Sequence, residues 1–393
     1  MLKKITHNLL FKVFVAIILG ILIGLYTPES VNRIVNTFNA FFGEFLGFAI
    51  PLIILGLIMP AIADLGKGAG KLLLITAALA YGSTLFSGFS TYFVASSIFP
   101  SFIEAQNVQA IEETARELTP YFSLTIPPVL DVMSALVLAF VIGLGLAPLG
   151  NSALKKVTSN FQKIIMFLIE KVIIPLLPLY ILSIFSAIAF KGQVASVLSV
   201  FVKIIGVIFI MHILLMVIQY IIAGAITKKN PFKALITMAP AYFTALGTQS
   251  SAATIPVTLQ QAEKNGVSPK VANFVIPLGA TIHLAGSTMK IVACAVALML
   301  MQGMDFNFGM FAGFVMMLGI AMVAAPGVPG GAIMAAVGIL QTMLGFDAEA
   351  QALMIALYIA MDSFGTAANI TGDGAIALIV NRIVRDKKET STS

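Results

Sequence analysis

Four polar side chains recur along one apolar segment near the end of the chain. Asp362, Thr366, Asn369 and Asp373 are spaced by 4, 3 and 4 positions, which places them on one face of an α-helix. An ionised group at the centre of a bilayer costs about 2.5 to 3.5 kcal/mol on insertion scales, so charges there usually mark a functional site. The alternative is structural, with both carboxylates buried against Lys or Arg. The stripe favours a binding site over contact with lipid.

The composition of the chain places these carboxylates in a membrane. Of 393 residues, 59% are hydrophobic and only 10% are charged, and the mean hydropathy is +1.02. These values lie outside the range of soluble globular proteins. The net charge of +6 comes from basic residues in short loops and near the termini, a pattern of membrane orientation and not of nucleic-acid binding. The single Cys294 excludes an intrachain disulfide.

Six apolar segments precede the polar stripe, and the loops between them alternate in charge. The segments lie near 8–26, 40–63, 71–98, 129–149, 160–189 and 194–226. The basic loops carry Lys67, Lys71, Lys155, Lys156, Lys228, Lys229, Lys233, Arg382, Arg385, Lys387 and Lys388, and the acidic loops carry Glu29, Glu104, Glu112, Glu113, Glu117, Asp347 and Glu349. No small-residue cleavage site follows the first segment, so we interpret it as a retained helix. The positive-inside rule then predicts an even number of crossings with both termini in the cytoplasm.

Two later segments are broken by Gly, Pro and Ser. Region 232–263 returns to the cytoplasmic side that it left, which requires a re-entrant hairpin. Region 303–346 is broken at Pro326–Gly331 and lies between two acidic loops on the outer side. Broken backbone at membrane depth is tolerated only where it is buried in protein or lines a cavity. Two such breaks of opposite orientation indicate an inverted-repeat transporter that binds its substrate near the midplane.

Four runs of residues, at 250–258, 277–282, 327–334 and 369–373, resemble the dicarboxylate/amino acid:cation symporters, the glutamate-transporter family. The resemblance covers essentially the whole chain. It implies an all-α polytopic membrane protein with eight transmembrane helices and two opposed re-entrant hairpins, assembled as a homotrimer in the cell inner or plasma membrane. It also implies an elevator motion. The chain would form one integral membrane unit, with a scaffold at about 1–70 and 129–190, a transport part at about 71–98 and 194–385, and a cytoplasmic tail at 386–393.

The resemblance also implies a substrate site. Asp362 matches the aspartate that holds the substrate α-amino group, and Asn369 matches the asparagine that meets the α-carboxylate. The other matched substrate positions are Ser250, Ser251, Val328, Gly330 and Thr366. Helix N-termini at the two hairpin tips suit an anion such as the carboxylate. An amine together with a carboxylate implies an α-amino acid as the substrate.

One position departs from the members that carry acidic substrates. At the position of Gly365 those members have an Arg, whose guanidinium binds the side-chain carboxylate of the substrate through two hydrogen bonds. Without that cation, burial of a second carboxylate costs several kcal/mol. We therefore expect a small neutral amino acid. A dicarboxylate or an acidic amino acid is the alternative.

The resemblance implies one intact cation site and one weakened site. The first sodium site is matched by Gly279, Asn369 and Asp373. Tyr81 and Thr84 match ligands of a second site, but its aspartate is replaced by Ala285 and its asparagine by His283. The weakened site lacks a charge and is not expected to bind sodium.

Lys290 and His283 are candidates for coupling. Lys290 is an unusual charge within a span, and its ammonium could take the place of a lost metal; the alternative is that it snorkels to an interface. His283 could carry a proton near neutral pH, or hydrogen-bond within the bundle. Coupling to Na⁺ and coupling to H⁺ both stay open. No covalent cofactor is predicted.

Other functions fit the residues less well. Two catalytic aspartates must approach each other, whereas the helix between Asp362 and Asp373 separates them by about 16 Å of rise. The sequence contains no Walker loop for nucleotide hydrolysis. An ion channel, lined by the polar stripe, is the alternative of a different class. The sequence predicts a secondary active symporter and not an enzyme.

Overall fold

The chain is mainly helical over the residues that the computed structural model describes, which are 9–65, 71–101, 103, 118–149, 152–192 and 194–390. Among them there is no β-strand. The first half contains α2 (Leu9–Tyr26), α3 (Glu29–Leu65), α4 (Lys71–Ile98), the 3-10 turn η1 (Phe99–Ser101), α6 (Val132–Leu146), α7 (Ala153–Leu168), the π-helical turn η2 (Ile169–Ile173) and α8 (Ile174–Phe190). The predicted loop residues Lys67, Glu104, Glu112, Glu113 and Glu117 lie outside the described residues.

The second half contains the helices around the polar stripe. They are α9 (Val194–Thr227), α10 (Pro231–Thr237), α11 (Ala239–Thr248), α12 (Ser251–Lys264), α13 (Pro269–Ile282), α14 (Ala285–Met301), α15 (Phe308–Ala324), α16 (Gly331–Leu344), α17 (Ala348–Ala360) and α18 (Asp362–Thr390). Helices α11 and α12 pack against each other, as do α15 and α16. We call these the first and the second helix pair. The tip of the first is Gln249–Ser250, and the tip of the second is 325–330.

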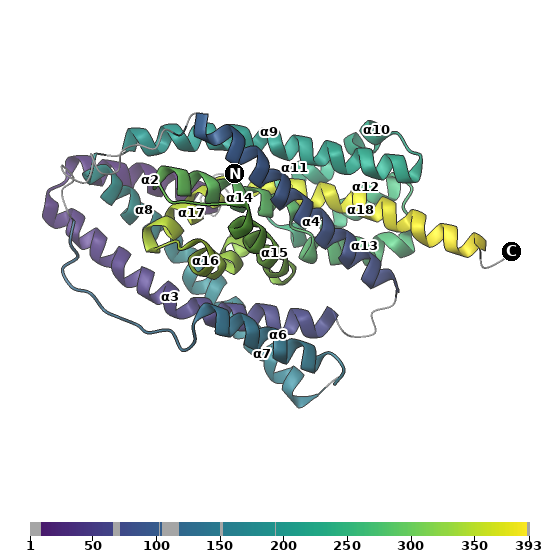
Figure 1. Ribbon diagram of the computed structural model, residues 1–393, viewed down its shortest axis with the longest axis horizontal. Helices are drawn as coiled ribbons and strands as arrows, with labels where there is room; N and C mark the ends of the chain where they lie inside the picture. The colour runs from purple at the N-terminus through teal and green to yellow at the C-terminus, as the bar shows by residue number, and fades with distance from the viewer. Residues whose placement is uncertain are drawn as a thin grey trace.

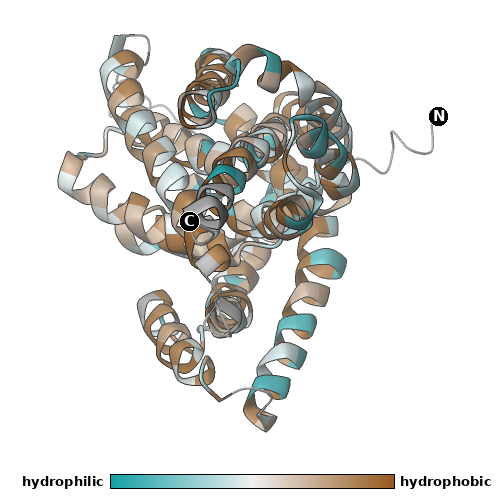
Figure 2. Ribbon diagram, turned by 90° about the vertical axis from the view of Figure 1, so that its right-hand side faces the viewer, coloured by the Kyte–Doolittle hydropathy of each residue, from teal (hydrophilic) through white to brown (hydrophobic). Residues whose placement is uncertain are grey.

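Within the described residues, five helical spans are long and apolar enough to cross a membrane, or six when the bent pair α17 and α18 counts as one. The five are Glu29–Ala63, Leu72–Ser101, Ala153–Phe190, Val197–Thr227 and Pro269–Met301. The segments expected near 8–26 and 129–149 form the shorter helices α2 and α6. Many large apolar side chains are exposed, such as Phe14, Val202 and Ile210, and Figure 2 shows hydrophobic residues along the outside of the helices. An apolar surface of this extent is typical of a protein surrounded by lipid.

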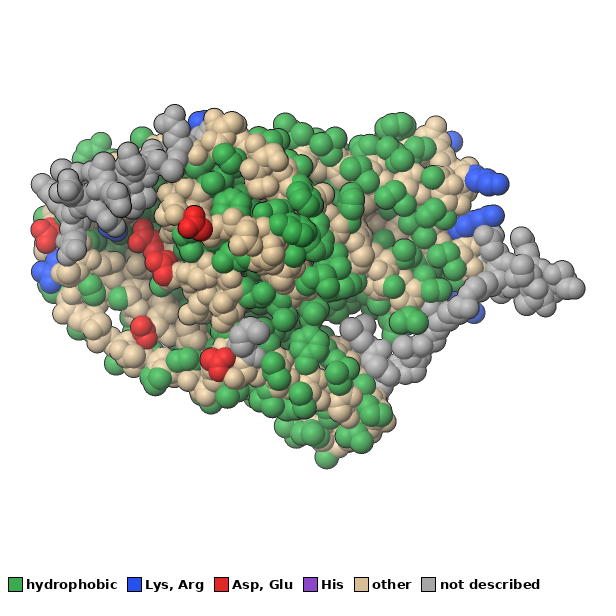
Figure 3. Space-filling model, viewed as in Figure 1, with side chains coloured by type: hydrophobic (Ala, Val, Ile, Leu, Met, Phe, Trp, Pro, Cys, Tyr) green, Lys and Arg blue, Asp and Glu red, His purple; other side chains and the backbone are tan. Residues whose placement is uncertain are grey.

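The helices pack in two groups (Figure 1). In the first group, α2 packs on α8, and α3 packs on α6, α7 and α8. In the second group, α18 packs on α9, α11, α13 and α14, and α14 packs on α4. The groups meet where α3 contacts α15 and α16, and where α17 contacts α2 and α8. Figure 3 shows acidic side chains in the half away from the C-terminus, together with a few basic ones, and a group of Lys and Arg side chains at the end that carries the C-terminus.

Candidate functional site

Four helix N-termini meet at the polar stripe because the chain is broken beside each of them. Helix α12 follows Gln249, which has a left-handed φ of 55°, and α16 follows Gly330, which has a φ of 75°. His283 is extended between α13 and α14, and a bend of 62° separates α17 from α18. The N-terminus of a helix carries a partial positive charge of about half an electron. Hydrogen bonds between these ends join them into one site.

Asp362 is the centre of this site. Its Oδ1 lies 3.0 Å from the Nζ atom of Lys290, and its Oδ2 accepts a hydrogen bond of 2.8 Å from the amide of Gly330. Asp362 is also the first residue of α18, so its negative charge lies at the positive end of its own helix. The carboxylate therefore joins α14, α18 and the tip of the second helix pair.

Lys290 is fully buried and does not snorkel to an interface. Besides Asp362, its ammonium donates to the carbonyl of Met361 at 3.4 Å and lies 3.6 Å from the centre of the Tyr358 ring. A carboxylate, a carbonyl and an aromatic face are the groups that bind a primary ammonium well. The structural alternative required both carboxylates of the stripe to pair with Lys or Arg. One of them, Asp362, does pair with a lysine.

Gly365 makes room for this lysine. A Cβ atom placed on Gly365 would lie 2.4 Å from Cε and 2.6 Å from Nζ of Lys290, closer than such atoms approach. The end of Lys290 therefore fills the space in which any side chain at position 365 would begin. The expectation of a neutral substrate was based on the absence of a cation at position 365, and the structure places a cation beside it.

Asn369 is held against the N-terminus of α14. Its Oδ1 accepts from the amides of Gly286 at 2.7 Å and Ser287 at 3.3 Å, and its Nδ2 donates to Ser287 Oγ at 3.1 Å. The Tyr358 hydroxyl donates to the same Ser287 Oγ at 3.0 Å. Asn369 thereby caps a helix whose first amides would otherwise be unsatisfied. Thr366, the remaining residue of the stripe, is buried beside them.

Asp373 and His283 form a second polar centre. His283 Nδ1 lies 2.9 Å from Asp373 Oδ1, and His283 Nε2 lies 3.0 Å from Ser83 Oγ. The same Ser83 Oγ accepts a hydrogen bond of 3.0 Å from the side-chain amide of Gln219. An ionised carboxylate only accepts, so Nδ1 donates to it, and Nε2 is free to accept from the serine hydroxyl. This chain of hydrogen bonds uses both ring nitrogens of His283 and connects α4, α9 and α18.

Two buried oxygen atoms of this centre, Asp373 Oδ2 and Gln219 Oε1, have no hydrogen-bond partner among the described residues, and neither has the buried Thr84 Oγ1 on α4. A buried acceptor without a partner costs about 1 to 3 kcal/mol and points to a bound ion or water. Gly279 packs directly on Asp373, since a Cβ atom there would lie 2.8 Å from Oδ1. Oxygen ligands of this kind fit a hard cation such as sodium. Tyr81 instead donates its hydroxyl to the Met316 carbonyl at 3.3 Å, on α15.

The tips of the two helix pairs touch each other. Ser250 Oγ donates a hydrogen bond of 2.9 Å to the carbonyl of Gly327. Ser251 is buried at the start of α12, and the Val328 carbonyl accepts from the amide of Gly331 at 2.9 Å. The structure therefore brings the predicted substrate residues of both tips together with Asp362.

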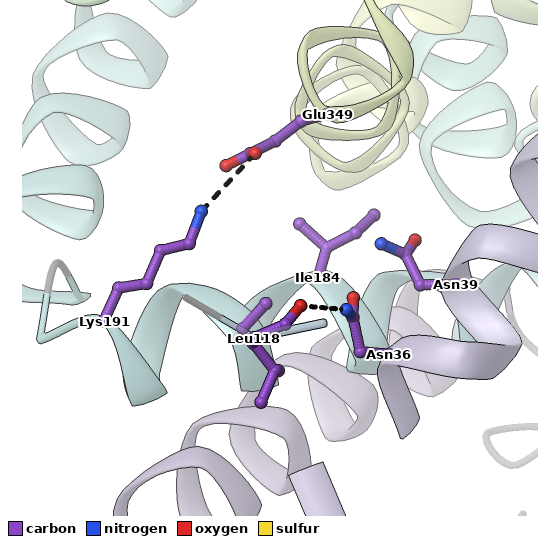
Figure 4. Close-up of a pocket in the computed structure, with 7 residues that line it drawn as sticks. Asn36, Asn39, Leu118, Ile184, Lys191 and Glu349 are labelled. Carbon is purple, nitrogen blue, oxygen red and sulfur yellow. Dashed lines mark hydrogen bonds and ion pairs between the residues drawn. The ribbon is translucent and has the colours of Figure 1, made fainter. Parts of the chain in front are cut away.

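A separate pocket of about 220 Å³ lies between α3, α8 and α17 and contains none of the predicted site residues (Figure 4). It is lined by Asn36, Asn39, Leu118, Ile184, Ala187, Lys191 and Glu349. Its ion pair, Lys191 with Glu349, is 3.8 Å long and partly exposed, so it is a weak interaction. The polar chemistry of the molecule lies instead around α14 and α18.

Sequence reasoning did not identify Ser83, Gln219, Tyr358 or Ser287 as parts of the site. Tyr358 stands four residues before Asp362, so the spacing of the stripe could have included it. Ser83 and Gln219 belong to α4 and α9, and no spacing connects them with the stripe. Only the packing of the helices brings them to His283.

Comparison with known proteins finds relatives along nearly the whole chain. The model of the sodium:dicarboxylate symporter family matches residues 9–383. The serine/threonine transporter SstT of Acinetobacter baumannii is 28% identical over 382 residues, which cover 93% of this chain and 94% of that protein. Excitatory amino acid transporter 2 of Homo sapiens is 29% identical over 261 residues, covering 64% of this chain and 44% of that protein.

Excitatory amino acid transporter 3 of Mus musculus is 34% identical over 165 residues, or 42% of this chain and 31% of that protein. The chain thus spans nearly the whole bacterial relative and less than half of either excitatory amino acid transporter. All these relatives are transporters, which confirms the expectation that the protein is not an enzyme. The match to the family model covers nearly all of the chain, and the chain belongs to the sodium:dicarboxylate symporter family.

Proposed function

We propose that this protein is a secondary active symporter that moves a small, neutral amino acid across the cell membrane together with a cation. The observation that carries the proposal is the ammonium-binding environment of Asp362. A primary ammonium, that of Lys290, is already bound there by a carboxylate, a carbonyl and an aromatic ring. The α-ammonium of an amino acid is the same chemical group and would bind the same carboxylate.

The neutral side chain is supported by the space around Gly365. Because the end of Lys290 fills that space, little volume is left for a long substrate side chain. The relative that aligns over almost the whole chain is a serine/threonine transporter, and both of those substrates are small and neutral.

An acidic amino acid or a dicarboxylate is the second candidate, and one observation favours it. The buried ammonium of Lys290 lies beside Gly365, where it could pair with a second substrate carboxylate. Relatives named excitatory amino acid transporters match parts of the chain. The two candidates differ in whether Lys290 is a barrier to the side chain of the substrate or a partner for it.

The coupling cation is proposed to be sodium, bound by Asp373 and Asn369 with the carbonyl of Gly279, with a proton as the alternative. The unpaired Oδ2 atom of Asp373 supports this assignment, because a cation would supply its missing partner. Bound sodium would supply positive charge beside Asp373 and tie α13 to α18. His283 and Lys290 remain coupling candidates through their contacts with Asp373 and Asp362.

The transport mechanism is proposed to be an elevator motion within a homotrimer, with eight transmembrane helices. The separation of the helices into two packed groups supports a scaffold of α2, α3 and α6–α8 and a moving part of α4 and α9–α18. The two helix pairs would be re-entrant hairpins whose tips gate the site. The cluster of basic side chains beside the C-terminus supports a cytoplasmic location for that end (Figure 3).

Uptake into proteoliposomes tests the proposal. Serine, threonine, alanine, aspartate, glutamate and succinate would be offered separately, with a sodium gradient or a proton gradient imposed. We expect sodium-driven accumulation of a small neutral amino acid, and no accumulation in protein-free vesicles or after the gradient is collapsed. Accumulation restricted to the acidic compounds would establish the second candidate, and a substrate-independent current without accumulation would indicate a channel.

A pair of substitutions separates the two candidates further. Gly365→Arg alone is expected to reduce uptake of the native substrate about tenfold or more, because the new side chain must displace the buried Lys290 from Asp362. Adding Lys290→Met removes the competing ammonium and leaves the guanidinium as the one cation near Asp362. The double variant should therefore gain uptake of aspartate, measured in the same vesicles against Lys290→Met alone. Undiminished uptake in Gly365→Arg would show that Lys290 does not occupy this space during transport.

A further inference from the structure

Building on the proposed function, we infer that Lys290 is an internal substitute for the substrate's α-ammonium. In substrate-free protein it pairs with Asp362, and this pairing allows the tip of the second helix pair to close against the first. The substrate's α-ammonium then displaces Lys290 from Asp362 when it binds. The inference assigns Lys290 to the substrate site and not to a metal site.

The position of Lys290 supports this assignment first. Its ammonium contacts Asp362 Oδ1, the Met361 carbonyl and the Tyr358 ring, all of them at the junction of α17 and α18. No contact joins it to Asp373, whose partner is His283. Ala285, the position of the lost aspartate, instead accepts a hydrogen bond from Ser87 through its carbonyl at 2.7 Å. Lys290 therefore pairs with Asp362, the carboxylate that is proposed to bind the substrate.

Asp362 connects the ammonium to the tip of the second helix pair. One of its oxygens binds Lys290 and the other binds the amide of Gly330, in the same tip that touches Ser250 through Gly327. Closure of the tips buries this carboxylate, and the side chain of Asp362 is only 5% exposed. A buried carboxylate without a cation costs several kcal/mol, so closure without the ammonium is unfavourable. Lys290 removes this cost when no substrate is present.

The exchange of partners keeps the charge of the site balanced. Asp362 and Lys290 together are neutral, and an amino acid adds one ammonium and one carboxylate. When the substrate ammonium takes Asp362 Oδ1, Lys290 retains the Met361 carbonyl and the Tyr358 ring and gains the substrate carboxylate as a counter-ion within the same pocket. No buried charge is left without a partner in either condition. A symporter with this device closes its site when it carries no substrate, as net uptake requires.

Disulfide trapping of the two tips tests the inference without any transport measurement. A Cβ atom on Gly327 would lie 3.8 Å from the Cβ of Ala252, which is within the range of disulfide bonds. The pair Ala252→Cys and Gly327→Cys would be built in full-length protein that also carries Cys294→Ala, which removes the single native cysteine. The rate of disulfide formation in purified protein without amino acids reports closure of the tips. Cysteines that have formed the disulfide no longer react with maleimide-polyethylene glycol, so the unlabelled fraction on a denaturing gel measures disulfide formation.

Lys290→Met in this background should slow disulfide formation about tenfold or more, because Asp362 then has no cation. The matched control adds Asp362→Asn, which removes the uncompensated charge but keeps an oxygen for the Gly330 amide. Its rate of disulfide formation should return to within about threefold of the rate in the trapping protein that keeps both Lys290 and Asp362. Gly365→Ala pushes the ammonium aside without removing it, and should slow closure in the same direction. It provides an independent result if Lys290→Met does not fold.

An unchanged rate in Lys290→Met, or in Gly365→Ala, would overturn the inference. Equal slowing in Lys290→Met and in its Asp362→Asn control would also overturn it, because Lys290 would then act through packing alone. The result is separate from the proposed function. Failure of the uptake panel would remove the assignment of an amino acid substrate, whereas the trapping rates would still show whether Lys290 controls closure.

Discussion

Asp362→Asn is expected to abolish amino acid uptake, with a loss of about 30-fold or more, since removing one partner of a buried charge pair costs about 2 to 5 kcal/mol. The amide retains the shape of the carboxylate and can still accept from the Gly330 amide. It supplies no charge for the substrate ammonium. Initial rates of uptake in proteoliposomes, at equal amounts of reconstituted protein, measure the effect.

The same substitution is expected to lower thermal stability, because it leaves the fully buried Lys290 without its carboxylate. The double variant Asp362→Asn with Lys290→Met removes both charges and is the matched control. It should recover the melting temperature, measured by size-exclusion chromatography after heating, and should still fail to transport. Uptake at the native rate in Asp362→Asn would refute the role of Asp362 as the amine site.

The polar stripe could be predicted from the sequence because its chemistry is local. Asp362, Thr366, Asn369 and Asp373 follow the period of a helix, and α18 contains all four as buried residues. The bend before Asp362 could not be predicted in the same way. Met361 has no Gly or Pro beside it, so the sequence suggests one continuous helix from Tyr358 onward. The break turns Asp362 into the first residue of a helix and Tyr358 into the wall of the ammonium site.

The partner of Lys290 could not be predicted either. The sequence shows an unusual charge within a span, but neither its depth nor its neighbours follow from spacing. The structure pairs it with a residue 72 positions later, on another helix. The same holds for His283, which bonds Asp373 at a separation of 90 residues and Ser83 at 200. Such contacts depend on how broken helices pack, and a local pattern carries no information about that packing.

Asp373→Asn is expected to raise the sodium concentration for half-maximal uptake about tenfold or more, while the preference among amino acids stays the same. Asn can still accept from His283 Nδ1 through its amide oxygen, so the hydrogen bonds to Ser83 and Gln219 are retained. The variant loses the negative charge and the unpaired oxygen Oδ2 that the native Asp373 offers to a cation. Because a cation site without its charged ligand binds more weakly, the effect falls on sodium and not on the amino acid. Uptake measured over a range of sodium concentrations at constant ionic strength determines the shift.

Asp347→Asn provides the matched control for this change. Asp347 caps α17 by accepting from the Ala350 amide at 2.8 Å, and Asn caps a helix about as well, so the same chemical change there should leave sodium dependence unaltered. If Asp373→Asn also keeps the native sodium dependence, Asp373 does not bind the coupling ion. Uptake by that variant under a proton gradient alone would then assign coupling to protons and leave Asp373 as the structural partner of His283.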